Sequence, residues 1–426
     1  MTEKPATRSP LLSNEDWVSV WMGFGFIALV AAGMRLALPG LSWDAGEVAK
    51  VVSGDNLSST GALFVLFLAI SSIGVWMMGG NIGRYGAGFV GVFALGWLSL
   101  ILAGNATAKY WGLSYVVFGL LIGLLISNVF YVPSWLLPGV RTEFYIKTGL
   151  VILGSNILFG EILQAGFLGV LQAALVILVV WYFCFWICKK FRVDDEFAAM
   201  LSTAVAICGV SAAIAACGAI QGDRKKLSYV TSLVLVVAAP MMLIMPWAIE
   251  SFEIPALVGG AWVGGTIDTS GAVVAAGELV GESALKAATI VKFSQNAMLG
   301  LAAFGLSLWW TFRQGTETAE KPSASVIWER FPKFVLGFMV ASLLFSFVLN
   351  PEVVSETKGL MKGLRTWWFA LAFVCIGLET RFRDLVAMDE GRPAMAFVIA
   401  QAVNVAWTLV IAYLLFGGIL FDAPDL

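Results

Sequence analysis

Residues 263–277 read VGGTIDTSGAVVAAG, and residues 204–218 read AVAICGVSAAIAACG. Both stretches lie inside long apolar segments, yet both consist largely of Gly, Ala, Ser and Thr. Glycine weakens a helix interior, and a serine hydroxyl can satisfy backbone groups that a break sets free. Two interpretations stay open for 204–218. Either the helix is broken and its second half points a positive N-terminal end at an anion, or small residues let neighbouring helices pack closely.

The rest of the chain is far more apolar than a soluble protein. Of its 426 residues, 59% are hydrophobic and 13% are charged, whereas soluble domains carry about 25% charged residues. A membrane-spanning helix needs about 20 mostly apolar residues. The sequence therefore predicts an all-α polytopic membrane protein with about 13 transmembrane helices and excludes a large soluble enzyme. The expected segments are 17–38, 61–79, 84–104, 112–131, 145–160, 166–188, 197–220, 228–250, 256–280, 286–312, 333–349, 366–379 and 394–418.

The last ten segments are interpreted as an inverted five-plus-five repeat, because each half holds an odd number of spans. One pairing sets AICGVSAA of the seventh segment opposite FVCIGLET of the twelfth, and LGSNILFG of the fifth opposite FSQNAMLG of the tenth. A rival pairing sets Gly154, Phe159 and Glu161 opposite Gly377, Phe382 and Asp384. The expected parts are a tail at 1–16, added helices at 17–111, repeats at 112–250 and 251–418 with a polar linker at 313–333, and a tail at 419–426.

Several functions are excluded by composition. The chain has no histidine, which excludes Ser-His-Asp and Cys-His nucleophile systems and histidine zinc sites. All five cysteines lie in apolar runs, so we expect buried thiols rather than disulfides or metal ligands. A net charge of -2 gives no basic excess for nucleic acid, and no Walker-type loop is present for ATP. We therefore expect no enzyme and no cofactor beyond Na⁺ or H⁺ as a coupling ion.

Asp268 is a carboxylate near the middle of the segment 256–280. The hydroxyls of Thr266, Thr269 and Ser270 flank it, with glycines on both sides. Carboxylate, hydroxyl and exposed carbonyl oxygens suit a hard cation or a proton. The alternative is that this stretch is a loop near the membrane surface, which would leave Asp268 solvated.

Lys292 lies about two turns into the segment 286–312, and Ser294, Gln295 and Asn296 follow it. Three interpretations stay open for its ammonium group: it reaches the nearer membrane surface, it pairs with Asp268, or it faces an anionic substrate. Gln295 is three residues further on and shares its helix face.

Other polar residues inside the expected spans complete the candidate set. Gln401 and Asn404, three residues apart, are expected to form hydrogen bonds between helices. The candidate substrate-binding residues are Asn156, Cys208, Gly209, Ser211, Thr269, Ser270, Lys292, Gln295 and Asn296. The candidate coupling-ion residues are Thr266, Asp268 and Glu379. Basic residues number fifteen in the loops on the N-terminal side and ten on the other, which predicts a cytoplasmic N-terminus.

Six motifs occur in order along the chain. They are LLIGLLISNVFYVPSWLLPG at 120–139, LGSNILFG at 153–160, AICGVSAAIAA at 206–216, GTIDTSGAVVAAG at 265–277, ATIVKFSQNAMLG at 288–300 and GLETRFRDL at 377–385. Over about residues 112–418 the chain resembles the YeiH-like family of sulfate exporters. The resemblance implies a fold similar to that of cation/proton antiporters and bile-acid-type symporters. In those proteins two crossed, broken helices lie in a mobile core that moves like an elevator.

The resemblance also implies a secondary transporter of the bacterial inner (cytoplasmic) membrane, with residues 209–211 at one crossing and, by analogy, a homodimer. The chain departs from the family pattern. Where the family has His followed by an acidic residue, this chain has Asp268 and Thr269. A family Gln is Ala272 here, and a family Arg is Gln295. The loss of an Arg and a His weakens the case for sulfate and makes Asp268 a candidate for the coupling role.

The sequence thus predicts a secondary active transporter of a small anion, such as sulfate, a sulfonate or a small carboxylate, coupled to H⁺ or Na⁺. The alternative is a Na⁺/H⁺ antiporter without an anionic substrate. A membrane enzyme is the least supported class, because no constellation of catalytic carboxylates or histidines is visible at a membrane edge.

Overall fold

The computed structural model describes residues 9–44, 47–111, 113–314, 325–381 and 391–426. In these ranges the regular structure is helical, apart from one isolated bridge between Trp43 and Asn105. The all-α prediction is therefore confirmed. Of the expected tail at 1–16 and linker at 313–333, residues 1–8 and 315–324 lie outside the described ranges.

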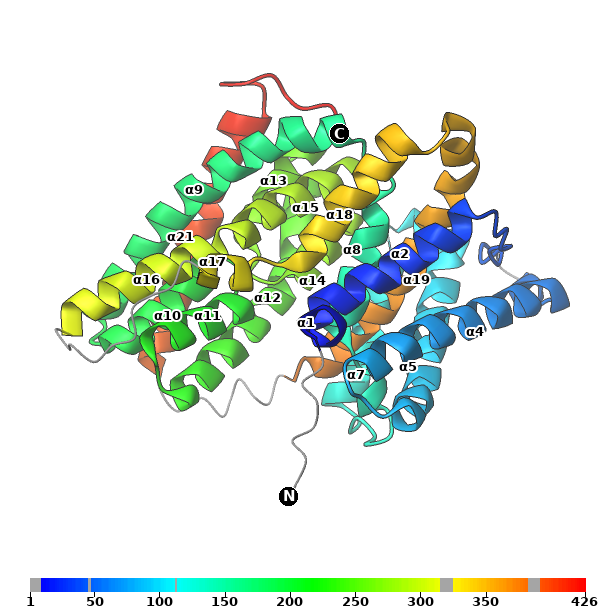
Figure 1. Ribbon diagram of the computed structural model, residues 1–426, viewed down its shortest axis with the longest axis horizontal. Helices are drawn as coiled ribbons and strands as arrows, with labels where there is room; N and C mark the ends of the chain where they lie inside the picture. The colour runs from blue at the N-terminus through cyan, green and yellow to red at the C-terminus, as the bar shows by residue number, and fades with distance from the viewer. Residues whose placement is uncertain (1–8, 45–46, 112, 315–324, 382–390) are drawn as a thin grey trace. The chain divides into compact units, whose positions relative to one another are not determined.

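The helices follow one another closely along the chain (Figure 1). They are α1 (Pro10–Ser13), α2 (Glu15–Ala31), α3 (Val48–Val51), α4 (Gly54–Met77), α5 (Ile82–Gly104), α6 (Ala106–Tyr110), α7 (Tyr115–Asn128), η1 (Leu137–Gly139), α8 (Thr142–Gly154), α9 (Phe159–Lys190), α10 (Asp195–Ala206), α11 (Val210–Ile220), α12 (Arg224–Ser251), α13 (Ala256–Thr266), α14 (Ser270–Val280), α15 (Glu282–Ala297), α16 (Leu299–Gln314), α17 (Ser325–Arg330), α18 (Lys333–Leu343), η2 (Leu344–Val348), α19 (Pro351–Glu379) and α21 (Gly391–Phe416).

Among the described residues, six helices are long and apolar enough to cross a membrane individually: α4, α5, α9, α12, α19 and α21. Each of the other expected segments also contains helix, but in shorter pieces. The count of thirteen crossings, the inverted repeat and the cytoplasmic N-terminus stay predictions.

The chain forms two compact units. The first unit comprises residues 1–159 and 333–379. In it α19 packs against α5, α7 and α8. The contact with α7 is close because glycines face each other: a Cβ on Gly123 would lie 2.4 Å from the carbonyl oxygen of Val374, and one on Gly377 would lie 2.5 Å from that of Leu120. The buried Trp368 ring lies among the rings of Phe26, Phe67, Phe144 and Tyr145.

The second unit comprises residues 160–332 and 380–426. In it α13 and α15 lie side by side (Figure 1), and α21 packs against both α10 and α13. Small residues allow the α13–α15 approach. A Cβ added to Gly260 would lie 2.3 Å from the carbonyl oxygen of Ala284, and one added to Gly264 would lie 2.5 Å from that of Ala288.

Both small-residue stretches are broken helices. For 204–218 the structure therefore has the break that one of the two interpretations predicts. Helix α10 ends at Ala206 and α11 begins at Val210, with Gly209 between them at φ 61°. A positive φ costs a residue with a side chain more than it costs glycine, so glycine suits this position. Helix α13 ends at Thr266 and α14 begins at Ser270, and Ile267 between them is extended at φ -73° and ψ 132°.

Three expectations about segments differ from the structure. The segment 366–379 was expected to be short, but it is the second half of α19, which has 29 residues. Its first half contains Lys358, Lys362 and Arg365, so apolarity alone did not indicate it. Arg365 is nevertheless fully buried.

The segment 286–312 is two helices, α15 and α16, that meet at Met298. The first repeat pairing sets the broken seventh segment opposite the continuous α19, whereas the second break lies in the ninth segment.

A charged network holds the start of α10. Asp194 caps the helix by accepting a hydrogen bond from the Phe197 N–H at 3.0 Å, and Lys226 donates to both Asp194 and Glu196, at 2.8 and 2.9 Å. Partial burial raises the pKa of the Asp194 carboxyl, but the donors Lys226 and Phe197 outweigh it and hold that pKa below its ordinary value.

The α13–α15 contact gives a first prediction. Gly264→Val forces a side chain against the backbone of α15, which cannot move without shifting the whole helix. We expect the free energy of unfolding in detergent to fall by about 1–3 kcal/mol or more. The matched control is Gly166→Ala in α9, where a Cβ meets nothing within 4 Å. That variant should be neutral or more stable by about 0.5–1 kcal/mol, since alanine favours a helix. Equal behaviour of the two variants contradicts the packing described.

Candidate functional site

The two breaks meet inside the second unit. A Cβ on Gly209 would lie 3.0 Å from the Cβ of Asp268, so the break of α10–α11 touches that of α13–α14. We call this place the crossing: residues 207–209 and 267–269 with the side chains of α15 and α21 that bond to their flanking carbonyls. Each break leaves backbone carbonyls at the end of one half-helix and N–H groups at the start of the next. The chemistry of the crossing follows from how these groups are satisfied.

Helix α15 supplies partners for both carbonyl ends. Lys292 Nζ donates to the Ile207 carbonyl oxygen at 2.8 Å and to Gln295 Oε1 at 2.9 Å. Gln295 Nε2 in turn donates to the Gly265 carbonyl oxygen at 3.0 Å. Lys292 is only 1% exposed, so its ammonium group does not reach a membrane surface. The prediction that Gln295 shares its helix face is confirmed.

Side chains of α21 also donate hydrogen bonds to carbonyl groups at the ends of α10 and α13. Asn404 Nδ2 donates to the carbonyl oxygens of Val205 and Thr266, at 3.2 and 3.3 Å, and so joins one break to the other. Gln401 Nε2 donates to the Thr266 carbonyl oxygen at 2.9 Å. Thr408 orients the Asn404 carboxamide, because its hydroxyl donates to Asn404 Oδ1 at 2.8 Å. The expectation that Gln401 and Asn404 bond between helices is confirmed.

The N-terminal ends of the half-helices are less occupied. Gly209 precedes α11 and offers no side-chain cap. The hydroxyl of Thr269 caps α14 by accepting from the Ala272 N–H at 3.3 Å. Each helix start carries about half a positive elementary charge and has N–H groups that lack partners in their own helix. At the crossing, therefore, side chains bond to the C-terminal carbonyl groups of α10 and α13. The N-terminal ends of α11 and α14 have N–H groups of the kind that bind anions.

Asp268 lies between these positive ends. Its side chain is 1% exposed, and no donor among the described residues lies within hydrogen-bond distance of its Oδ2. The alternative of a solvated loop is therefore wrong, and Asp268 is buried as the first interpretation predicts. Lys292 interacts electrostatically with Asp268 but makes its direct contacts with Ile207 and Gln295 instead. The two charges are neighbours rather than a hydrogen-bonded ion pair.

Most of the sequence-derived candidates come together here. The crossing includes Cys208, Gly209, Asp268, Thr269, Lys292 and Gln295. Thr266 and Ser270 flank it, and Asn296 Nδ2 donates to Ser270 Oγ at 3.2 Å. Ser211, in the first turn of α11, has an exposed side chain. Asn156 and Glu379 belong to the first unit, where Glu379 accepts a hydrogen bond from the Thr142 hydroxyl at 2.9 Å. The roles given to these residues stay predictions.

The sequence did not place Gln401, Asn404 and Gln172 at the site. Gln172 is fully buried in α9 and donates from Nε2 to the Ala261 carbonyl oxygen of α13 at 2.7 Å. All three are amides inside apolar helices, and that is a signal for a buried partner. Which carbonyl they bond cannot be inferred without the fold.

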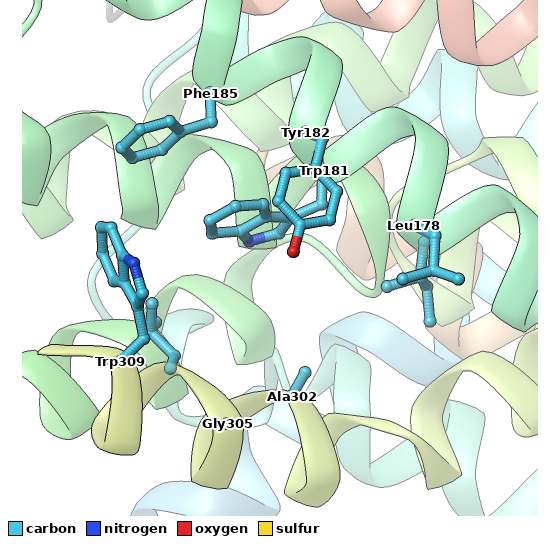
Figure 2. A pocket seen from close by; sticks show the side chains of 9 residues that line it. Leu178, Trp181, Tyr182, Phe185, Ala302, Gly305 and Trp309 are labelled. Carbon is cyan, nitrogen blue, oxygen red and sulfur yellow. The ribbon is translucent and has the colours of Figure 1, made fainter. Parts of the chain in front are cut away.

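A separate cavity of about 530 Å³ lies between α9 and α16 (Figure 2). Leu178, Trp181, Tyr182 and Phe185 reach it from α9, and Ala302 and Trp309 from α16. None of the described residues that line it is charged, so this lining does not suit a small anion. We therefore take the crossing as the candidate site.

Comparison with known proteins supports an integral membrane protein. The family model described as "Conserved hypothetical protein 698" matches residues 87–396. The UPF0324 membrane protein RB9488 of Rhodopirellula baltica is 39% identical over 397 residues, covering 91% of this chain and 73% of that protein. A UPF0324 membrane protein of Nitratidesulfovibrio vulgaris is 36% identical over 391 residues, covering 87% and 68%.

A further relative is the UPF0324 membrane protein TauZ of Paracoccus denitrificans, 27% identical over 318 residues, which cover 72% of this chain and 91% of that protein. No solved structure matches the chain. The chain belongs to the YeiH-like UPF0324 family of membrane proteins, which confirms the resemblance found in its motifs.

The two-sided contact of Asn404 gives a second prediction. Asn404→Leu keeps the approximate side-chain size but leaves the Val205 carbonyl without this donor. Since an unsatisfied buried polar group costs about 1–3 kcal/mol, we expect a loss of that size in unfolding free energy.

The control for this prediction is Thr311→Val in α16. The Thr311 hydroxyl donates within its own helix, to the Ser307 carbonyl oxygen at 2.8 Å, and no other partner occurs among the described residues. This variant should change stability little. If Asn404→Leu is as stable as the control, Asn404 does not join the breaks.

Proposed function

We propose that this protein is a secondary active transporter of a small anion, coupled to H⁺ or Na⁺, with the anion bound at the crossing. The observation that carries the proposal is the asymmetry of the two breaks. Side chains of α15 and α21 bond to the carbonyl ends, whereas the start of α11 has no side-chain cap and the start of α14 has only the Thr269 cap. The side chains at the carbonyl ends are those of Lys292, Gln295, Gln401 and Asn404.

Magnitudes make Lys292 the decisive residue. A helix N-terminus stabilises a partly buried anion by up to about 2 kcal/mol. Removing an anion from water costs several kcal/mol even after relaxation. Two helix ends alone do not offset that cost reliably, so a full positive charge is needed nearby. Lys292 supplies it, and two of its three N–H groups are already directed by Ile207 and Gln295.

The location of the crossing supports alternating access. Broken helices place unwound backbone inside a membrane only where it is buried in protein or lines a water-filled path. Asn404 ties both breaks together, so they would move as one body with the bound anion. A rigid body that carries the site from one side to the other is an elevator-type motion. The cellular compartment would be the bacterial inner membrane, and the assembly a homodimer.

A Na⁺/H⁺ antiporter without an anionic substrate is the second candidate. The buried Asp268 favours it, since a carboxylate without a hydrogen-bond donor on Oδ2 suits a transported cation or proton. In that function the helix N-termini would stabilise the Asp268 carboxylate itself rather than a separate anion.

Transport by reconstituted protein tests the proposal and separates the candidates. Proteoliposomes would be assayed with radiolabelled sulfate, a sulfonate and a dicarboxylate under imposed Na⁺ and pH gradients. We expect uptake of one anion class in the wild-type protein and its loss in Lys292→Met, which keeps the chain length but removes the charge. A charge-conserving control, Lys286→Arg, alters a lysine that pairs with Glu161 and should preserve transport.

Absence of anion flux with folded protein under every gradient contradicts the anion proposal. Cation-linked proton movement that requires Asp268 but ignores anions would then establish the antiporter. Anion flux that persists in Lys292→Met would show that the anion binds elsewhere.

A further inference from the structure

Several buried oxygen atoms near the crossing have no hydrogen-bond donor among the described residues. They are Thr266 Oγ1, Asp268 Oδ2, Asn296 Oδ1 and Gln401 Oε1. All four side chains are at most 5% exposed. Leaving one such group unsatisfied costs about 1–3 kcal/mol, so four of them at one place call for a common partner.

Three of these oxygens belong to side chains near the end of α13. Thr266 is the last residue of α13, and Asp268 follows it across the single extended residue Ile267. Gln401 is fixed beside them by its 2.9 Å bond to the Thr266 carbonyl oxygen. Only its N–H₂ group can face a carbonyl, so the orientation of this carboxamide is determined and Oε1 points elsewhere.

The fourth oxygen approaches from the start of α14. Asn296 is held there by its Nδ2 contact with Ser270 Oγ at 3.2 Å. The amide donors of the neighbouring side chains are directed elsewhere: the Asn404 amide bonds Val205 and Thr266, and the Gln295 amide bonds Gly265. No other donor of the described residues reaches any of the four oxygens. The Lys292 ammonium bonds Ile207 and Gln295.

We propose that Thr266, Asp268, Gln401 and Asn296 form a sodium site, so that Na⁺ is the ion that accompanies the anion. A bound proton would satisfy one pair of oxygens, whereas one cation serves as partner to several at once. Carboxylate, amide and hydroxyl oxygens are the ligands that hard cations prefer. The Lys292 ammonium already lies near the single carboxylate, so a divalent ion would leave more uncompensated positive charge than a monovalent one. This charge count favours a monovalent ion. The inference rests on the proposed function and adds the identity of its coupling ion.

Binding of Na⁺ at Asp268 would also affect binding of the anion electrostatically. An uncompensated Asp268 carboxylate would repel an anion from the α11 and α14 N-termini, because it lies between them. Na⁺ on Asp268 removes that repulsion without removing Lys292. Na⁺ and the anion should therefore each raise the affinity for the other, by reciprocal coupling.

Sodium binding to the purified full-length protein tests the inference. Apparent melting temperature would be measured against NaCl concentration, with choline chloride keeping the ionic strength constant and KCl as a second series. A ligand that binds only the folded state raises stability by mass action. We expect a saturable Na⁺ effect without an equal K⁺ effect, confirmed by binding of radioactive Na⁺.

Matched threonine variants locate the site. Thr266→Val removes a proposed ligand and should weaken Na⁺ binding by about tenfold or more. Thr289→Val is the control, since Thr289 Oγ1 is equally buried and equally lacks a partner among the described residues. Thr289 belongs to α15 and precedes Asn296 by seven residues, about two helical turns. Thr266→Ser, which keeps the hydroxyl, should retain binding. If Thr266→Val does not fold, Asn296→Ala provides the same comparison.

Each outcome decides the inference. Selective loss in Thr266→Val supports the site, and equal effects of Thr266→Val and Thr289→Val overturn it. No Na⁺ effect on the wild-type protein also overturns it. Anion transport driven by a pH gradient in that same preparation would leave the proposed function standing with a proton as the coupling ion.

Discussion

The structure of the second unit depends on one constraint: two helices are interrupted inside an apolar interior, and the exposed backbone groups must find partners. Water cannot supply them within a lipid environment, where each unsatisfied group costs several kcal/mol. Side chains from α15 and α21 therefore bond the carbonyl oxygens at Val205, Ile207, Gly265 and Thr266. The polar residues of these two apolar helices are there because the breaks require them.

This constraint explains why a lysine is fully buried. An ammonium group in such surroundings needs acceptors, and the carbonyl end of α10 with the Gln295 side chain provides them. The same arrangement fixes the position of the charge relative to the helix N-termini of α11 and α14. The structural role of Lys292 is thus compatible with the binding role proposed for it. The small residues of α13 and α15 allow the close approach of these two helices.

Much of this could be predicted from sequence, for identifiable reasons. The glycine and hydroxyl residues around Gly209 made a break one of two interpretations, because such residues are unusual in the middle of an apolar segment. Those around Asp268 marked a candidate ion site, but the break there was not predicted. Lys292 and Gln295 were found because charges and amides are rare there. The partners were beyond reach, since the meeting of Gly209 with Asp268 and of Asn404 with two carbonyls arises only when distant segments pack. Helix α19 was underestimated because charges in its first half masked a helix that buries Arg365.

The central claim is that the crossing is where a transported anion binds, and protection of an engineered cysteine tests it most directly. With the five native cysteines replaced, Ser270→Cys would place one thiol at the partly exposed start of α14, and Tyr182→Cys would place one in the apolar cavity of Figure 2. A charged thiol reagent would be applied with and without the anion that the protein transports. The account predicts that the anion slows modification at residue 270 and not at residue 182. An anion that is transported yet protects residue 182, or protects neither, would contradict it.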